Sequence, residues 1–373
     1  MAKRGILVTG GCGFIGSHLV DRLILDGHDV RVYDILEPQV HGKKKPKYLN
    51  KNAEYIYGDI RNTRKLKKAL AGIEVVYHDA SQVGVGQSMY EIGKYVSHNS
   101  YGTAVLLELL ISCRNRVKKL VVASSMSLYG EGGYKCPSCG IVYPRLRNEA
   151  QLLSKKWEMQ CPDCQKDLLP IPTSEDKPLF PTSIYATTKR CQEEMCLEVG
   201  IAYKIPTVAL RYFNVYGPRQ SLNNPYTGVG AIFLSRIKNN NPPLIFEDGR
   251  QTRDFIYVSD IVEANILAME KKEANYSVFN VGTGEPHSIF DIAQTIINIT
   301  RRDLKPRILN KFRAGDIRHC YADITKIQNK LNFKPAVSFE EGMKRLIAWS
   351  SHEAARDLSS KAQKELIKRG LAE

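Results

Sequence analysis

The chain has 373 residues, a formal net charge of +15 and an ordinary composition, with 43% hydrophobic and 25% charged residues. This length is enough for two domains, or for one large domain with insertions. No apolar run reaches the roughly 18 residues of a membrane span, which excludes a helical integral membrane protein. A strand-like run follows Met1–Arg4 directly and leaves no room for a cleavable signal peptide, so we expect a cytoplasmic protein with no membrane partner.

The positive charge suits anionic ligands and raises the question of nucleic acid. Much of the excess lies in three short basic runs, Lys43–Lys47, Arg64–Lys68 and Lys361–Arg369. Such runs are typical of a solvated basic surface. Nucleic-acid binding therefore stays the less favoured interpretation.

Short apolar runs alternate with helical periodicity in the first part of the chain, which predicts βαβ units and a parallel sheet. The predicted strands are Gly5–Thr9, Asp29–Tyr33, Glu54–Tyr57, Val75–His78, Lys119–Ala123 and Pro206–Arg211. The predicted helices are Ser17–Asp26, Thr103–Cys113 and a segment from Tyr185 to about Val199. After Gly217-Pro218 the elements become shorter, which indicates a smaller mixed domain over the carboxyl edge of the sheet, and residues 340–370 form a charged helical stretch.

A glycine-rich loop follows the first predicted strand. Gly11-x-Gly13-x2-Gly16 matches the general dinucleotide fingerprint, and Gly10-x2-Gly13-x2-Gly16 matches the variant of short-chain dehydrogenases. Glycines allow a tight turn from strand to helix and let a pyrophosphate approach the backbone N–H groups, while the helix dipole favours its charge. The context of strand, loop and helix predicts a dinucleotide site.

Residues at the ends of the next strands complete this prediction. Asp34 lies 18 residues after the last glycine of the loop, where a carboxylate binds both ribose hydroxyls and repels a 2′-phosphate, so NAD is favoured over NADP. Asp59 is positioned to reach the adenine, with a turn carboxylate as the alternative. Ala80-Ser81 would pass under the nicotinamide half, whereas His78 is interpreted as a strand-end histidine without a catalytic role.

Tyr185 and Lys189 stand one helical turn apart, and Ser125 follows the fifth predicted strand. One helical turn places the phenol and the ammonium on the same face. A phenol gives or takes a proton, a nearby cation lowers its pKa, and a hydroxyl orients the substrate. On a nicotinamide-binding scaffold, these groups predict combined proton and hydride transfer.

Together these motifs resemble the extended short-chain dehydrogenase/reductases, specifically the nucleotide-sugar epimerases and dehydratases. The further strings that carry the resemblance are Asn99 before Gly102-Thr103, Ser124–Gly130, Arg211–Pro218, Arg253–Phe255 and Arg313–Asp316. The resemblance covers nearly the whole chain apart from a cysteine-rich insertion. It implies a nucleotide-diphosphate sugar as substrate and a homodimer as the usual assembly.

The resemblance also implies roles by position, with Ser125 as the catalytic hydroxyl, Tyr185 as the acid/base and Lys189 as the ribose-binding lysine. The implied cofactor contacts are Gly10, Gly13, Phe14, Ile15, Gly16, Asp34, Asp59, Ile60, Ala80, Ser81, Asn99, Ser124, Tyr185, Lys189, Tyr212 and Val215. The implied substrate contacts are Ser125, Asn214, Phe246, Arg253, Arg313 and Asp316. Among these, the aromatic ring stacks on the nucleobase, and the arginines and the asparagine bind the diphosphate.

The residues after Ser125 separate the possible reactions. Dehydratases of this family carry an Asp-Glu pair there, but this chain has Met126 and Ser127, which leaves no evident acid/base for elimination and favours a 4-epimerase. Longer strings, such as Gly84–Tyr90 and Asn224–Val229, resemble dTDP-L-rhamnose 4-epimerases. UDP-glucose 4-epimerase, a dehydratase or reductase on a similar sugar, and a nucleic-acid-binding protein that reuses the fold are the alternatives.

Two CxxC pairs, Cys136/Cys139 and Cys161/Cys164, lie in the insertion. Two such knuckles complete a tetrahedral four-thiolate site with no open position, so we predict a structural zinc ribbon. Disulfides, an iron–sulfur centre and a metal-free remnant are the alternatives. The insertion joins the strand of Ser125 to the helix of Tyr185, which favours a lid or an interface element beside the active site over nucleic-acid binding through Arg145, Arg147, Lys155 and Lys156.

The predicted fold is therefore α/β, with a Rossmann-type doubly wound parallel sheet, a smaller mixed α/β substrate domain and an inserted zinc ribbon. Residues 1–133 and 172–215 are expected to form the NAD-binding domain, residues 134–171 the zinc-ribbon insertion, and residues 216–373 the nucleotide-sugar-binding domain.

Overall fold

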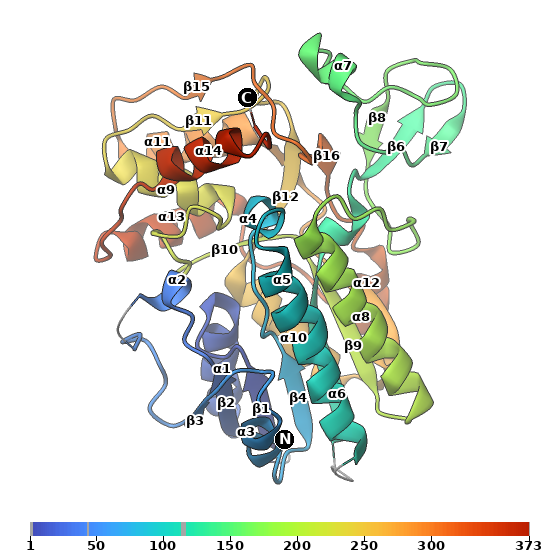
Figure 1. Cartoon of the computed structure of the whole chain (residues 1–373), viewed down its shortest axis with the longest axis vertical. Helices are drawn as coiled ribbons and strands as arrows, with labels where there is room; N and C mark the ends of the chain where they lie inside the picture. The colour runs from blue at the N-terminus through green and yellow to red at the C-terminus, as the bar shows by residue number, and fades with distance from the viewer. Residues whose placement is uncertain (1–2, 43–44, 113–116, 373) are drawn as a thin grey trace.

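A seven-stranded parallel sheet forms the centre of the molecule, in the order β13-β9-β5-β4-β1-β2-β3 (Figure 1). The computed structural model describes residues 3–42, 45–112 and 117–372. The strands are β1 Gly5–Thr9, β2 Asp29–Asp34, β3 Glu54–Tyr57, β4 Val75–His78, β5 Lys119–Ser125, β9 Thr207–Tyr212 and β13 Ser277–Val281. This order confirms the predicted doubly wound fold and adds β13, which the sequence analysis did not predict.

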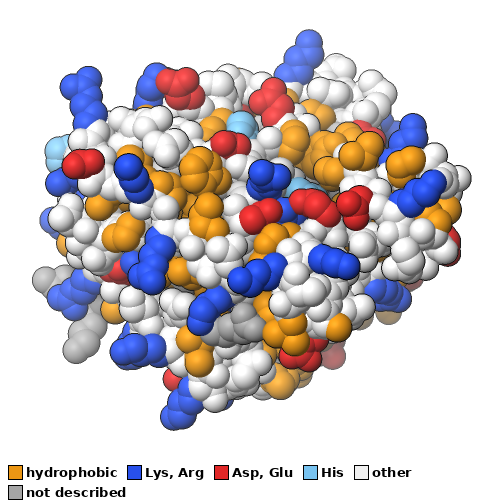
Figure 2. Space-filling view, turned by 90° about the horizontal axis from the view of Figure 1, so that it is seen from above, with side chains coloured by type: hydrophobic (Ala, Val, Ile, Leu, Met, Phe, Trp, Pro, Cys, Tyr) orange, Lys and Arg blue, Asp and Glu red, His pale blue; other side chains and the backbone are white. Residues whose placement is uncertain are grey.

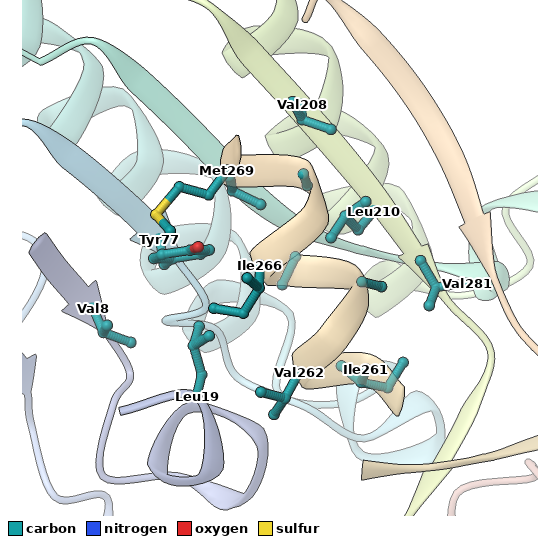
Figure 3. Packing of buried hydrophobic residues seen from close by; sticks show 14 of the residues in the cluster. Val8, Leu19, Tyr77, Val208, Leu210, Ile261, Val262, Ile266, Met269 and Val281 are labelled. Carbon is teal, nitrogen blue, oxygen red and sulfur yellow. The ribbon is translucent and has the colours of Figure 1, made fainter. Parts of the chain in front are cut away.

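Helices cover both faces of the sheet, because successive strand residues point to opposite sides. Ile6 and Val8 lie in one buried cluster, whereas Leu7 lies in the other. The first cluster is covered by α1 Phe14–Leu25, α10 Val258–Glu270 and α12 Thr325–Leu331, and the second by α3 Thr63–Ala69, α6 Gly102–Ser112 and α8 Ile184–Ala202. Figure 3 shows Ile266 and Met269 of α10 packed toward Tyr77 of β4.

The first helix starts earlier than predicted. α1 begins at Phe14, directly after Gly13, whereas the apolar periodicity predicted a start at Ser17. The first turn is therefore part of the glycine loop itself, and its backbone N–H groups lie next to the end of β1. The helix predicted over Thr103–Cys113 is α6, although Cys113 lies outside the described residues.

A second unit lies above the carboxyl edge of the large sheet (Figure 1). Its strands are β10 Asn214–Tyr216, β12 Thr252–Tyr257, β14 Pro286–Ser288 and β16 His319–Cys320, with a separate pair β11 Leu244–Ile245 and β15 Arg307–Ile308. Its helices are α9 Val229–Lys238, α11 Ile289–Thr300, α13 Phe339–Ser350 and α14 Ser359–Lys368. The chain crosses between the two units more than once, since α10 and β13 belong to the large sheet although they follow residue 216.

Residues of the cysteine-rich segment form a three-stranded antiparallel sheet in the order β7-β6-β8. Its strands are β6 Gly133–Cys136, β7 Gly140–Val142 and β8 Leu169–Ile171, and it carries the short helix α7 Glu149–Leu153. Figure 1 shows this segment at the upper right, on the side of β16. It therefore stands at the same end of the large sheet as the second unit.

The remaining elements are short. They are α2 Pro38–His41, α4 Val85–Ser88, α5 Ile92–Tyr95, a π-helical segment Val96–Tyr101, and 3₁₀ turns at Met126–Tyr129 and Lys272–Ala274. Among the described residues, no helix combines the length and the apolar character needed to cross a bilayer.

Candidate active site

A cavity of about 710 Å³ lies between the carboxyl ends of the large sheet and the second unit. Every residue predicted from the sequence to contact cofactor or substrate lines it, with the single exception of Asn99. Such a crevice is where open α/β sheets bind their ligands. The long-range arrangement therefore brings together side chains that are up to about three hundred positions apart in the chain.

The glycine loop forms one wall of the cavity, and its glycines are required by close backbone contacts. Gly10 has a φ of +73°, and a Cβ atom there would lie 2.8 Å from the backbone nitrogen of Ala80. A Cβ atom at Gly16 would lie 2.5 Å from the carbonyl oxygen of Gly10. The loop thus leaves the N-terminus of α1 open toward the cavity, as an anion site requires.

The Asp34 carboxylate is held at the edge of this loop. Its Oδ2 accepts a hydrogen bond of 2.9 Å from the Cys12 backbone, and its Oδ1 accepts one of 2.7 Å from Leu36. Each carboxylate oxygen has a second acceptor position. Two hydroxyl groups of a ribose could therefore bind there without displacing the backbone contacts.

Asp59 and Asn99, both predicted to contact the cofactor, are bonded to other protein groups. The Asp59 carboxylate is bound by the Arg61 guanidinium, with nitrogen–oxygen distances of 2.5 and 2.9 Å, and this hydrogen bonding lowers its pKa. Asn99 is buried behind the cavity wall, where it exchanges hydrogen bonds with the Gln82 backbone at 2.7 and 3.1 Å and donates one of 3.0 Å to Thr188. Asn99 therefore ties the loop after β4 to α8 and does not itself line the cavity.

Tyr185 and Ser125 meet at the carboxyl end of β5. Tyr185 is the second residue of α8, and its phenol makes a hydrogen bond with Ser125. The Ser127 hydroxyl donates to the Ser125 oxygen at 2.9 Å, so a second hydroxyl supports the first. Burial raises the pKa of Tyr185, and the Ser125 hydrogen bond lowers it by a smaller amount.

Lys189 lies one turn further along α8, but its ammonium does not set the pKa of Tyr185 as predicted. It donates to the carbonyl oxygen of Ala123 and, at 2.6 Å, to the Gln192 side chain. Burial lowers the pKa of Lys189 to about 8, and Asp79 acts in the opposite direction. The expected lowering of the phenol's pKa is therefore not present, because burial of the phenol outweighs the other effects and the ammonium is bonded elsewhere.

The other end of the cavity carries the predicted substrate residues. The Arg313 guanidinium lies 4.5 Å from the centre of the Phe246 ring and donates to Asp316 at 2.8 Å. The Arg253 guanidinium is bonded to backbone carbonyls of the segment 317–318. The Oδ1 atom of Asn214 is buried and has no hydrogen-bond partner in the described part of the chain, which suits a residue whose partner is a ligand.

The family follows from comparison with known proteins. The model of the NAD dependent epimerase/dehydratase family matches residues 6–145, and that of GDP-mannose 4,6 dehydratase matches residues 167–346. A dTDP-L-rhamnose 4-epimerase of Burkholderia thailandensis is 34% identical over 94% of this chain and 96% of its own length. This chain belongs to the NAD-dependent epimerase/dehydratase family, within the extended short-chain dehydrogenase/reductases.

Solved structures of this family agree. A UDP-glucose 4-epimerase of Thermotoga maritima with UDP-glucose has a TM-score of 0.77 at 34% identity and covers 93% of this chain and 98% of its own. A UDP-glucuronic acid 4-epimerase of Bacillus cereus, in complex with UDP-glucuronic acid and NAD, has a TM-score of 0.77 at 30% identity and covers 94% and 100%. The chain is thus an enzyme of the nucleotide-sugar epimerase family, although these relatives act on different sugars.

Two buried groups of this epimerase-family site were not predicted from the sequence. Both carboxylate oxygens of Asp79 are buried without a hydrogen-bond partner among the described residues, and burial raises the pKa of Asp79 to about 7. The side chain of Gln192 connects Lys189 to His78, since its amide nitrogen lies 2.8 Å from the His78 ring. Asp79 had a signal in the sequence, a carboxylate directly after the fourth strand, whereas Gln192 had none apart from its place one turn after Lys189.

His78 has the structural role expected for it. Its ring is buried and lies 2.8 Å from the Thr9 hydroxyl and 2.9 Å from the Thr103 hydroxyl. Burial lowers its pKa to about 3, so the ring is neutral at physiological pH. A neutral, fully bonded histidine below the cavity holds β1, β4 and α6 together.

The four cysteines of the two CxxC pairs converge on one point. Their sulfur atoms all lie within 4.8 Å of one another, and Cys136 and Cys164 are 3.4 Å apart. A tetrahedral zinc with bonds of about 2.3 Å separates its sulfur ligands by about 3.8 Å. A disulfide, at about 2.05 Å, is much shorter than the observed distance. The donor set therefore fits a four-thiolate metal ion.

The four basic residues named in the same segment differ in their surroundings. The Arg145 guanidinium stacks 3.5 Å from the centre of the Phe180 ring, and Arg147 is buried in an ion pair with Glu247. Arg145, Lys155 and Lys156 are exposed, whereas Arg147 is not available to a ligand. Figure 2, which views the molecule from above, shows basic side chains spread among acidic and hydrophobic ones.

Proposed function

We propose that this chain is an NAD-dependent nucleotide-sugar 4-epimerase whose substrate is dTDP-L-rhamnose. The observation that carries the proposal is the arrangement of Ser125, Tyr185 and Lys189 in the cavity whose other end holds Phe246 and Arg313. The relative named for dTDP-L-rhamnose supports this sugar. UDP-glucose is the alternative, because a solved epimerase with that ligand is equally similar in sequence.

The cofactor end fits NAD. The glycine loop gives a pyrophosphate access to backbone N–H groups, and the Asp34 carboxylate favours a free ribose 2′-hydroxyl over a phosphate. The ribose of the nicotinamide half would lie at Lys189. When bound there, NAD supplies the nicotinamide that accepts the hydrogen of the sugar's C4 as hydride and gives it back.

The protein's own groups handle the proton. Bound NAD would bring a positive charge that counters the effect of burial on the pKa of Tyr185. As phenolate, Tyr185 then takes the proton of the 4-hydroxyl as that hydride leaves, and Ser125 orients the same oxygen by hydrogen bonding. The resulting 4-keto sugar turns in the pocket. The phenol then returns its proton to the oxygen as hydride arrives on the opposite face. The net reaction is inversion at C4, with neither oxidation nor loss of atoms.

Dehydration is the second candidate, because the GDP-mannose 4,6 dehydratase model matches residues 167–346. Elimination across C5–C6 requires a base and an acid beside the sugar. The two positions after Ser125 carry Met126 and Ser127, and the Ser127 hydroxyl is directed at Ser125. These residues support epimerisation over elimination.

The proposed reaction is tested with a panel of dTDP- and UDP-sugars, each incubated with the purified protein and followed by NMR. We expect conversion of dTDP-L-rhamnose to its C4 epimer without added cofactor. UDP-glucose and UDP-glucuronic acid are the controls. Turnover of UDP-glucose alone would move the assignment to the alternative substrate, and release of a keto sugar would favour the dehydratase.

We also propose that Cys136, Cys139, Cys161 and Cys164 hold one structural zinc ion. Four thiolates leave no open position for a substrate or water, so the ion would stabilise the fold of the insertion and take no part in catalysis. The cysteines that the structure describes are unpaired thiols, which is the expected state in the cytoplasm. Elemental analysis distinguishes zinc from iron.

A homodimer is the proposed assembly. Ile92, Val96 and Tyr101, on α5 and the π-helical segment, are 50, 44 and 58% exposed, which is unusual for three large hydrophobic residues on adjacent turns. A second copy of the chain could cover them. Light scattering after size-exclusion chromatography tests this, and the substitution Val96→Glu is expected to yield a monomer.

A further inference from the structure

The cysteine-rich insertion is connected to the second unit by buried ion pairs. Arg147, which lies between the two CxxC pairs, donates hydrogen bonds of 2.8 and 3.0 Å to the carboxylate of Glu247. The two side chains are only 1% and 3% exposed. The Arg147 guanidinium also donates a hydrogen bond of 3.3 Å to the backbone oxygen of Asp316.

Arg318 extends this connection. Its side chain is completely buried and bonds Asp248 at 2.7 and 3.0 Å, Glu247 at 2.9 Å and Glu158 at 2.5 Å. Glu158 comes from the insertion, whereas Glu247 and Asp248 come from the second unit. Two cations and three carboxylates therefore join three segments that are remote in the sequence. We call these five residues the ion cluster.

The ion cluster is adjacent to the residues proposed to bind the nucleotide diphosphate. Glu247 directly follows Phe246, on whose ring Arg313 lies. Arg253 donates hydrogen bonds of 2.6 and 2.9 Å to the backbone oxygens of Ile317 and Arg318. A shift of the cluster would therefore move the aromatic ring and both arginines.

At its other side the ion cluster is continuous with the four-cysteine site. The residue after Glu158, Met159, is packed in one hydrophobic cluster with Cys136 and Cys161. The carbonyl oxygen of Trp157 accepts a hydrogen bond of 2.8 Å from Arg147. The chain from 157 to 161 is thus fixed by the cysteines at one end and by the cluster at the other.

Buried ion pairs contribute little net stability, because desolvation offsets their attraction, but they define one geometry sharply. A bidentate arginine–carboxylate pair adds directional restraint. A structural metal at the cysteines would order the segment from which Glu158 projects. These effects act on the same end of the cavity, and the glycine loop and Asp34 are not bonded to any member of the cluster.

We propose that the four-cysteine module is a positioning element for the nucleotide-diphosphate end of the cavity, acting through Arg147, Glu158 and Arg318. Metal bound at the cysteines raises the affinity for the nucleoside diphosphate and leaves the affinity for the dinucleotide cofactor unchanged. The inference rests on the proposed function for the class of ligand, a nucleotide-diphosphate sugar. It assigns the insertion a role in substrate affinity instead of one in the chemical step.

The first experiment compares Arg147→Met with Lys156→Met, an exposed lysine of the same segment whose replacement removes the same charge. Titration calorimetry of the metal-loaded, full-length proteins measures binding of dTDP, UDP and, separately, NAD. Arg147→Met is expected to weaken nucleoside diphosphate binding about tenfold or more, since it leaves the Glu247 carboxylate, next to Phe246, without the charge that compensates it. NAD binding should stay within about twofold, and Lys156→Met should match the wild type.

Arg147→Lys sharpens the test, because lysine keeps the charge but cannot form the two parallel hydrogen bonds. Its affinity for nucleoside diphosphate should lie between those of the wild type and Arg147→Met. Equal weakening of nucleotide and NAD binding in Arg147→Met would indicate general loss of structure and overturn the proposal. Unchanged nucleotide binding would overturn it as well.

The second experiment needs no substitution and decides the matter if Arg147→Met does not fold. The metal is removed from the wild type by a chelator, and hydrogen exchange is followed along the chain. Faster exchange at residues 244–253 and 311–319, in addition to 134–171, is the expected result. Exchange that rises only within 134–171 would contradict the proposal.

The two experiments also separate this inference from the proposed function. A wild type that binds neither dTDP nor UDP would refute the proposed function, while the exchange at residues 244–253 would still test the positioning. A wild type that binds dTDP, with an affinity that neither Arg147→Met nor metal removal changes, would refute the positioning alone.

Discussion

The two ends of the cavity are constructed in different ways. At the cofactor end, the backbone does the positioning. Gly10 and Gly16 lie where a Cβ atom would collide with neighbouring backbone atoms, and two backbone N–H groups hold the Asp34 carboxylate. At the nucleotide end, side chains do the positioning. Arg147 bonds Glu247, a hundred positions away, and Arg318 bonds Glu158, 160 positions away.

This difference indicates how each end should fail. The cofactor end is sensitive to added atoms, because its backbone is closely packed, and it tolerates losses elsewhere. The nucleotide end is sensitive to lost charges, because removal of one partner of a buried ion pair leaves the other partner uncompensated. Substitutions of each kind therefore test whether the two ends are independent.

The largest effect on turnover should come from a substitution of Tyr185, which belongs to neither end. Tyr185→Phe removes the phenol oxygen that transfers the proton and should lower turnover by roughly 10²–10⁴-fold. Calorimetric affinities for NAD and dTDP should remain close to those of the wild type, since the hydroxyl alone is lost. Near-normal turnover of this variant would remove Tyr185 from the mechanism.

Cys136→Ser should affect the nucleotide end and leave the cofactor end intact. Loss of one of four thiolates should reduce the metal content from about one ion per chain to nearly none, because a structural site needs all four ligands. Elemental analysis and calorimetry measure the metal and the two affinities. Cys191→Ser, a cysteine outside the cluster, is the control and should retain the metal. A fully active, equally stable protein without metal would contradict the account.

Gly16→Ala should affect the cofactor end and leave the nucleotide end intact. The new Cβ atom would lie 2.5 Å from the Gly10 carbonyl oxygen, so the loop must shift. We expect the shift to lower the free energy of unfolding by about 1–3 kcal/mol. The affinity for NAD should fall, whereas the affinity for dTDP should change little. Gly93→Ala, in α5, has no atom within 4 Å of the new Cβ atom and should raise stability by about 0.5–1 kcal/mol. Urea unfolding compares the two, and equal effects would contradict the packing argument.

The smallest effect concerns pH. Burial lowers the pKa of Lys189 to about 8, so this ammonium is charged below that pH and neutral above it. Because this ammonium is the group proposed to bind the ribose of NAD, activity should fall as the pH rises past about 8. Asp79 raises the pKa of Lys189, so Asp79→Asn should move the falling limb of the pH–rate profile to lower pH. A limb that moves to higher pH, or not at all, would exclude this coupling.

The part of the fold that the sequence predicted is the part encoded locally. Each of the six predicted strands is an apolar run, and the glycine spacing specifies a loop between a strand and a helix. β13 was missed because its run, Ser277–Val281, contains two polar residues, and Asn280 is buried through hydrogen bonds to remote carbonyls. No window of sequence shows those partners.

The site shows the same division. Ser125, Tyr185, Lys189 and the glycine loop were predictable because their chemistry depends on residue type and spacing. The raised pKa of Tyr185 was not, since it depends on how deeply the phenol is buried. Arg147 was considered as one of several basic residues, but its pairing with Glu247 arises only when the insertion meets the second unit.

Transfer of an isotope tests the central claim, reversible oxidation at C4 within one site, most directly. dTDP-L-rhamnose carrying deuterium at C4 is incubated with the purified protein, and the product is examined by NMR and mass spectrometry. The account predicts an epimerised product that keeps deuterium at C4, with no exchange against added NADH and no accumulation of a dehydrated keto sugar. Loss of the label to the medium, or release of such a keto sugar, would contradict it.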